Sequence, residues 1–118
     1  MNNRETVEKV NEAFAKNRID DFLELCSDDI TWTMVGKPAV TGKPALKEMM
    51  SDDTWTPPEF SVSFIIADAD RAACEGHMKM AKKDGSEEYA GFFCDLYRFR
   101  DGKVCEMRSY FSSGAFQQ

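Results

Sequence analysis

The residue best placed to do chemistry is Asp95, a single acid among aromatic side chains. Successive residues of a strand point to opposite faces, so Phe93, Asp95 and Tyr97 share one face of the segment 89–100. On an exposed face this carboxyl is an ordinary surface acid. On an apolar face, burial raises its pKa, which suits an acid, a base or a hydrogen-bond donor. The chemistry therefore depends on which face is buried.

The pairing of this segment with the next one depends on the turn at Asp101-Gly102. A two-residue loop pairs Asp95 with Arg108, whereas a three-residue loop with Gly102 in the left-handed conformation pairs Asp95 with Met107. A slip of one residue moves every side chain to the other face. We expect the three-residue loop, because it groups the apolar residues of both strands on one face. Asp95 then lies on the apolar face without a cationic partner.

Metal and nucleophile chemistry find little support in the sequence. The four cysteines are Cys26, Cys74, Cys94 and Cys105, and they have no metal-ligand spacing. The single histidine, His77, lies on the charged face of its segment, where we expect a surface or subunit-interface residue. No serine follows the pattern of a nucleophile elbow. We expect no metal, no cofactor, and reduced, mostly buried cysteines.

The composition is that of an ordinary globular domain. The chain has 118 residues, of which 42% are hydrophobic and 31% charged, enough for one domain over residues 1–118. The net charge of −6 argues against nucleic acid or an anionic membrane as partners. No apolar run approaches the roughly 20 residues of a membrane span. Since Met1–Glu5 lacks the character of a signal peptide, we expect a cytoplasmic protein.

The hydrophobic periodicity predicts helices followed by antiparallel strands. Apolar residues recur at helical spacing over 4–17, a second short helix opens at Asp20-Asp21 and ends at 27–29, and Pro44 opens a third. Alternating patterns predict strands over 30–35, 60–67, 72–80, 89–100 and 103–111. We expect a frayed tail over 112–118. This order indicates an α+β fold in which a curved sheet wraps around the helices.

Three short motifs are spread along the chain. They are Asn17-Arg18-Ile19-Asp20 leading to Leu25-Cys26-Ser27-Asp28-Asp29-Ile30, Thr41-Gly42-Lys43-Pro44-Ala45-Leu46, and Tyr97-Arg98-Phe99-Arg100-Asp101-Gly102-Lys103-Val104. With the element order, they resemble the nuclear transport factor 2-like superfamily, which includes ketosteroid isomerases, SnoaL-like polyketide cyclases and scytalone dehydratase. The resemblance implies a cone-shaped roll, with N-terminal helices packed in a strongly curved, mostly antiparallel sheet. It also implies one apolar pocket and a homodimer formed through the outer sheet face.

The segment Asp95-Leu96-Tyr97-Arg98-Phe99 resembles the Asp-x-Phe-Arg-Phe strand of the ketosteroid isomerases. In those enzymes the aspartate is a protonated donor to the substrate oxyanion, so the resemblance implies a comparable role for Asp95. Their general base falls on Met34 of this chain, and their oxyanion-hole tyrosine falls near Val10. The machinery for steroid isomerisation is therefore incomplete here.

The inner-face residues form the candidate pocket, although each also suits a packed core. Asp95 is the candidate catalytic residue, and Tyr97 or Ser109 is expected to orient a substrate. The candidate ligand-binding residues are Phe14, Trp32, Met34, Trp55, Met78, Met80, Phe93, Tyr97, Met107, Ser109 and Phe111. Gly76 and Gly91 have no side chains on the same face, which would leave room for a ligand.

We therefore expect a protein that binds a small hydrophobic molecule, carbonyl-bearing or cyclic. If it is an enzyme, we expect a cofactor-independent isomerase, cyclase or dehydratase. In this hypothesis Asp95 transfers a proton or forms a hydrogen bond. The alternative is a non-catalytic ligand-binding or dimeric association domain. A homodimer is expected to bury the outer face around Cys94, Leu96, Tyr110 and His77.

Overall fold

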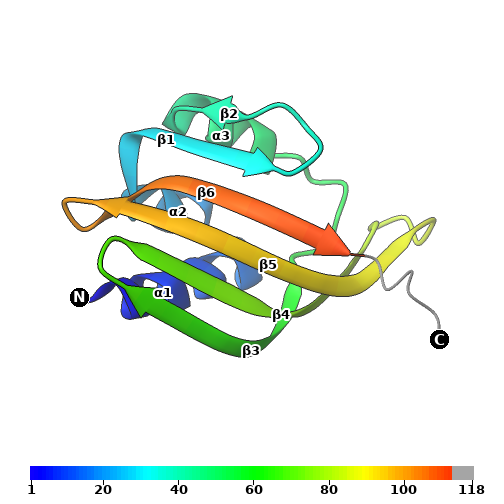
Figure 1. Cartoon of the computed structure of the whole chain (residues 1–118). Coiled ribbons are helices and arrows are strands. Elements are labelled where there is room, and N and C mark those ends of the chain that lie inside the picture. Colours follow the sequence, from blue (N-terminus) through cyan, green and yellow to red (C-terminus); the bar gives the residue numbers. More distant parts are fainter. Residues whose placement is uncertain (113–118) are drawn as a thin grey trace.

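The computed structural model describes residues 1–112. Its elements are α1 (Asn3–Ala15), α2 (Ile19–Glu24), β1 (Cys26–Met34), β2 (Val40–Thr41), α3 (Lys43–Met50), β3 (Glu59–Asp68), β4 (Arg71–Ala81), β5 (Glu88–Arg100) and β6 (Lys103–Ser112). The six strands form one sheet in the order β2-β1-β6-β5-β4-β3, with β1 and β6 parallel and the other pairs antiparallel. The three helices lie on one side of this curved sheet (Figure 1). The predicted α+β roll is confirmed.

Helix α1 begins with a capping box. The Asn2 side chain accepts a hydrogen bond from the Glu5 backbone N–H at 2.8 Å, and the Glu5 carboxylate accepts one from the Asn2 backbone N–H at 3.1 Å. Val7 and Val10 are fully buried where the helix packs on β3 and β4. The helix ends two residues earlier than predicted, because Asn17 adopts the left-handed conformation. Among residues 1–112, no helix is long and apolar enough to cross a membrane.

Strand β1 begins four residues before the predicted boundary. Residues 27–29 were expected to end the second helix, but they lie in the strand. The strand can begin here because Cys26 pairs with Val104, whose backbone N–H donates to the Leu25 carbonyl at 2.9 Å.

At the other end of the chain, Ser112 belongs to β6. The rest of the predicted frayed tail, 113–118, lies outside the described residues.

The β5–β6 turn differs from the expected three-residue loop. Asp101 and Gly102 both have positive φ and form a two-residue loop that pairs Arg100 with Lys103. A bulge at Cys105 follows, so that both Val104 and Cys105 are buried.

The bulge moves the register by one residue and pairs Asp95 with Ser109. Both pairings considered for Asp95, with Arg108 and with Met107, are therefore wrong. The expected apolar face is nevertheless formed, because a two-residue loop and a bulge together restore the side-chain alternation.

Gly76 is needed for a close approach between two backbones, and the expectation that it leaves room for a ligand is wrong. Strand β3 carries an irregularity between Val62 and Phe64 that presses its backbone onto β4. A Cβ atom at position 76 would lie 2.3 Å from the Ser61 carbonyl oxygen and 2.9 Å from the Val62 Cα. The space above this glycine is thus filled by main chain.

The variant Gly76→Ala is expected to lower the free energy of unfolding by about 1–3 kcal/mol, because the added methyl group must displace backbone atoms. The measurement is urea unfolding followed by circular dichroism. Lys79→Ala, an exposed change on the same strand, is the control and should stay within about 0.5 kcal/mol of the parent. Equal urea midpoints for the two variants would contradict the close approach of the β3 backbone to Gly76.

Candidate functional site

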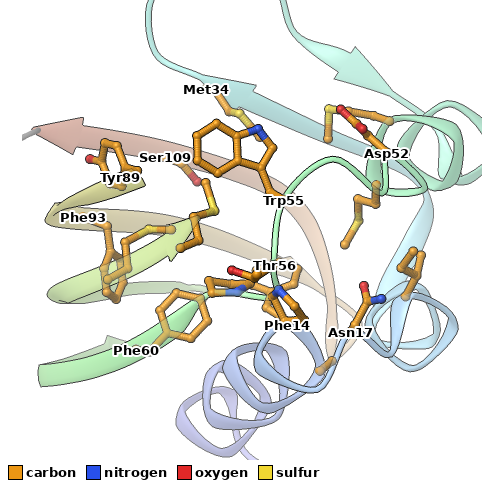
Figure 2. A pocket seen from close by; sticks show the side chains of 18 of the residues that line it. Phe14, Asn17, Met34, Asp52, Trp55, Thr56, Phe60, Tyr89, Phe93 and Ser109 are labelled. Carbon is orange, nitrogen blue, oxygen red and sulfur yellow. The ribbon is translucent and has the colours of Figure 1, made fainter. Parts of the chain in front are cut away.

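A cavity of about 500 Å³ lies between the inner face of the sheet, the helices and the loop at 51–58 (Figure 2). Aromatic rings and thioethers form most of the apolar part of its walls. The apolar lining residues with large side chains are Phe14, Ile19, Trp32, Met34, Met49, Met50, Trp55, Phe60, Met78, Met80, Tyr89, Phe93 and Phe111. Such a lining is typical of a site for a small apolar molecule.

Most of the candidate site residues lie at this cavity. They are Phe14, Trp32, Met34, Trp55, Met78, Met80, Phe93, Asp95, Ser109 and Phe111. Tyr97 and Met107 do not line it: they are 2% and 0% exposed and belong to the packed core. They share the inner face with Asp95, but they lie nearer the β5–β6 turn, where Tyr97 stacks on Phe99.

Several lining residues were missed by sequence reasoning. Met49 and Met50 come from the end of α3, which the topology places over the cavity. Tyr89 shares the alternation of Phe93 and Asp95, so the strand pattern alone could have identified it. No local pattern identifies the polar residues of the lining, because they come from separate loops. They are Asn17, Arg18, Lys37, Ser51, Asp52, Asp53 and Thr56.

Asp95 is the buried polar group of the cavity. It is 5% exposed and lies between Cys74 of β4 and Ser109 of β6. Burial raises the pKa of this carboxyl from 3.8 to about 6, and a hydrogen bond from Ser109 opposes part of the increase. No cation of residues 1–112 contributes to this pKa. Asp95 is thus a titratable group poised just below neutral pH.

A hydrogen-bond chain orders the side chains around Asp95. The Trp32 indole Nε1–H donates to the Ser109 Oγ at 2.8 Å. An indole nitrogen has no acceptor capacity, so Ser109 must accept here and its own O–H remains free to donate. Its neighbour across the strands is Asp95. The direction of the chain therefore runs from Trp32 through Ser109 to the carboxylate.

A second polar group lies behind Asp95. The Asn11 amide donates to the Cys74 Sγ at 3.4 Å, and the Tyr97 hydroxyl is buried without a partner among the described residues. Burial is the main cause that raises the pKa of Tyr97 well above its usual value, and the Asp95 charge adds to it. Tyr97 is consequently neutral near pH 7. Because it does not line the cavity, it is not available to orient a ligand there.

Trp55 is held over the cavity by the end of β4 (Figure 2). The Thr56 backbone N–H donates to the Ala81 carbonyl at 2.7 Å, and the Thr56 hydroxyl accepts from the Ala81 N–H at 3.0 Å. The Lys82 ammonium lies 5.6 Å from the centroid of the Trp55 ring. These contacts fix the loop that forms one wall of the site.

His77 lies on the other side of the sheet. Its ring is 4.4 Å from that of Phe92, and it is not among the cavity residues. The four cysteines are free thiols. Within residues 1–112, no group of three or more His, Cys, Asp and Glu side chains is arranged to hold a metal ion.

Residues 7–107 match the model of the SnoaL-like domain family. The chain belongs to this family. The search of curated proteins finds no match for this SnoaL-like domain.

Solved structures share the fold of this SnoaL-like domain at low sequence identity. An epoxide hydrolase from M. tuberculosis is 19% identical, with a TM-score of 0.81 and coverage of 92% of this chain and 81% of that one. A candidate polyketide cyclase from Xanthomonas campestris is 17% identical, with a TM-score of 0.83 and coverage of 94% and 93%. A candidate ketosteroid isomerase from Kribbella flavida is 15% identical, with a TM-score of 0.79 and coverage of 98% and 80%. These likenesses establish the fold.

Replacing Asp95 by Asn is expected to stabilise the fold at pH 7 by about 1–3 kcal/mol. The folded pKa of about 6 lies above the ordinary 3.8, so the cost of ionising the buried carboxyl appears as pH rises through about 4. It becomes constant above about pH 6. Urea unfolding of both proteins at about pH 4 and pH 7 measures the difference, which should be small at the lower pH.

Asp52→Asn is the matched control for this change. The Asp52 carboxyl is exposed, and hydrogen bonds from Thr54 lower its pKa, so its removal should give no gain in stability. Destabilisation by Asp95→Asn at pH 7, together with a depressed Asp95 pKa by NMR titration, would mean that Asp95 belongs to an ion pair.

Proposed function

We propose that this SnoaL-like domain binds a small hydrophobic molecule in its cavity, with Asp95 as the polar contact for that molecule. The observation that carries the proposal is the buried carboxyl of Asp95, which faces a mostly apolar cavity of about 500 Å³. Cavities of this size and lining bind small organic molecules, with few polar groups that fix their orientation.

Cofactor-independent proton transfer is the catalytic form of this proposal, as an isomerase, cyclase or dehydratase. A carboxyl with a pKa of about 6 is ionised near neutral pH and is still basic enough to accept a proton from a substrate. Asp95 is the residue that would exchange that proton. A change in the pH profile of turnover on Asp95→Asn would identify this chemistry.

A non-catalytic binding domain is the second candidate, and one observation favours it. Met34 lines the cavity where ketosteroid isomerases carry their general base, and Val10, near their tyrosine position, is fully buried in the core. A thioether and an isopropyl group can neither accept nor donate a proton. In this candidate Asp95 only orients the ligand.

Filling the cavity is expected to abolish ligand binding. The variant Met80→Trp places a larger side chain into the space, and its control is Lys79→Trp, the next residue on the same strand, which is exposed and points to the other face. With 1-naphthol as the probe, the melting temperature of the parent and of the control should rise with probe concentration, whereas that of Met80→Trp should not. Equal shifts in all three proteins would place binding outside the cavity.

We also propose that the domain is a homodimer formed through the outer face of the sheet. Five large apolar side chains, which we call the outer patch, are 39–60% exposed on this face. They are Phe64, Ile66, Phe92, Leu96 and Tyr110, and cross-strand pairing through Ala73, Glu75 and Cys94 places them on one side. A contiguous apolar area of this kind is typical of an interface.

Sedimentation at micromolar concentration is expected to give twice the chain mass of 13.4 kDa. Leu96→Glu places a charge in the centre of the outer patch and should yield the monomer. Ala45→Glu, an exposed change on α3, adds the same charge elsewhere and should leave the dimer intact. A parent protein that sediments at the mass of one chain would refute this interface.

A further inference from the structure

The hydrogen-bond donors around Asp95 limit the chemical class of the ligand. This inference rests on the proposed binding function. Trp32 and Ser109 are the cavity-lining side chains that could donate a hydrogen bond beside this carboxyl, since the Tyr97 hydroxyl does not line the cavity. The indole N–H of Trp32 is already engaged with the Ser109 Oγ at 2.8 Å. The Ser109 O–H is left to the Asp95 carboxylate. Neither donor is therefore free for a ligand when Asp95 is ionised.

The groups that face Asp95 carry no compensating charge. From β4 the neighbour is Cys74, from β5 it is Tyr97, and from β6 it is Ser109. Helix α1 contributes Asn11, through its contact with Cys74. Burial raises the pKa of the Cys74 thiol and of the Tyr97 hydroxyl, so both are neutral near pH 7. The ionised carboxylate is consequently the only charge at this end of the cavity within residues 1–112.

The cationic residues of the lining do not reach this carboxylate. Lys37 and Arg18 are exposed and come from loops outside the sheet. Asp52 and Asp53, also exposed, come from the loop after α3, and Asp53 forms an ion pair with Lys83. Exposed charges of both signs are screened by water, whereas Asp95 is not.

The walls beside Asp95 are suited to positive charge. The rings of Phe14 and Trp32 are stacked at 5.5 Å, and those of Phe60 and Phe93 meet edge to face at 5.4 Å. The Phe14 and Phe60 rings lie 6.5 Å apart and join the two pairs. Aromatic faces attract cations through their quadrupoles, most strongly where water is excluded. Thioethers such as Met78 add polarisable contacts.

We propose that the ligand of this cavity is a hydrophobic amine or quaternary ammonium compound whose cationic centre contacts Asp95. A cation compensates the buried, unpaired carboxylate and contacts aromatic rings at the same time. A neutral carbonyl ligand is less suited to contact Asp95 at neutral pH, because the ionised carboxylate only accepts hydrogen bonds and the neighbouring donors Trp32 and Ser109 are engaged.

Binding of a cation is linked to the ionisation of Asp95. The ligand binds the carboxylate form, so its affinity rises with pH up to about 6 and is constant above. A quaternary ammonium compound has no titratable proton of its own, and the pH dependence then reports on the protein alone.

The test uses benzyltrimethylammonium and its uncharged carbon isostere neopentylbenzene with the full chain. Binding is followed by intrinsic tryptophan fluorescence, because Trp32 and Trp55 line the cavity. The cation should bind more tightly than the isostere at about pH 7.5. Its affinity should fall about tenfold at about pH 5, where roughly one carboxyl in ten is ionised, while that of the isostere stays constant.

Two matched variants complete the experiment. Asp95→Asn should weaken binding of the cation at least about tenfold at about pH 7.5 and leave the affinity for the isostere unchanged. Unchanged binding of the isostere would also show that the cavity of the variant is intact. Asp68→Asn removes an exposed acid at the end of β3, outside the cavity lining, and should leave both affinities unchanged. An equal loss with Asp68→Asn, a cation affinity independent of pH, or tighter binding of the isostere would each overturn the amine assignment while leaving the proposed binding function in place. Binding of neither probe would overturn both.

Discussion

The bulge at Cys105 is the constraint on which the rest of the site depends. A two-residue turn without it would carry Asp95 opposite Arg108, on a sheet face where an ion pair is available. With the bulge, the carboxyl faces Ser109 and the apolar cavity. One extra residue in β6 thus decides whether Asp95 faces the hydroxyl of Ser109 or the cationic side chain of Arg108. The raised pKa, the hydrogen-bond chain and the burial of Val104 with Cys105 all follow from it.

Much of this fold could be predicted from the sequence, because local patterns specify it. Alternation along 72–80 and 89–100 identified strands and their inner faces, and the helices began near their predicted first turns. The register of the last hairpin could not be predicted, since a turn with a bulge and a longer loop give the same alternation of side chains. The tight contact at Gly76 was also missed, because it depends on an irregularity in β3.

The site residues that lie on strands could be predicted from the alternation of side chains. Those whose position depends on the packing of helices and loops could not. Trp32, Phe93 and Asp95 follow from alternation alone, and all three line the cavity. Tyr97 obeys the same rule yet lies in the core, because its depth along the strand depends on what covers it. Met49 and Met50 reach the cavity only through the placement of α3. Periodicity indicates which face of the sheet a side chain occupies. Whether that side chain then lies in the packed core or at the cavity depends on how the helices and loops pack over it.

The parallel pairing of β1 with β6 also affects how the chain folds. Within residues 1–112, strand β1 pairs otherwise only with the two residues of β2, so its main neighbour is β6, the last of the described strands. Contacts between segments this distant in sequence slow folding, because a long loop must close before they can form. The Trp32–Ser109 hydrogen bond spans these two strands. The polar end of the cavity is therefore assembled only after β6 has been synthesised and has paired with β1.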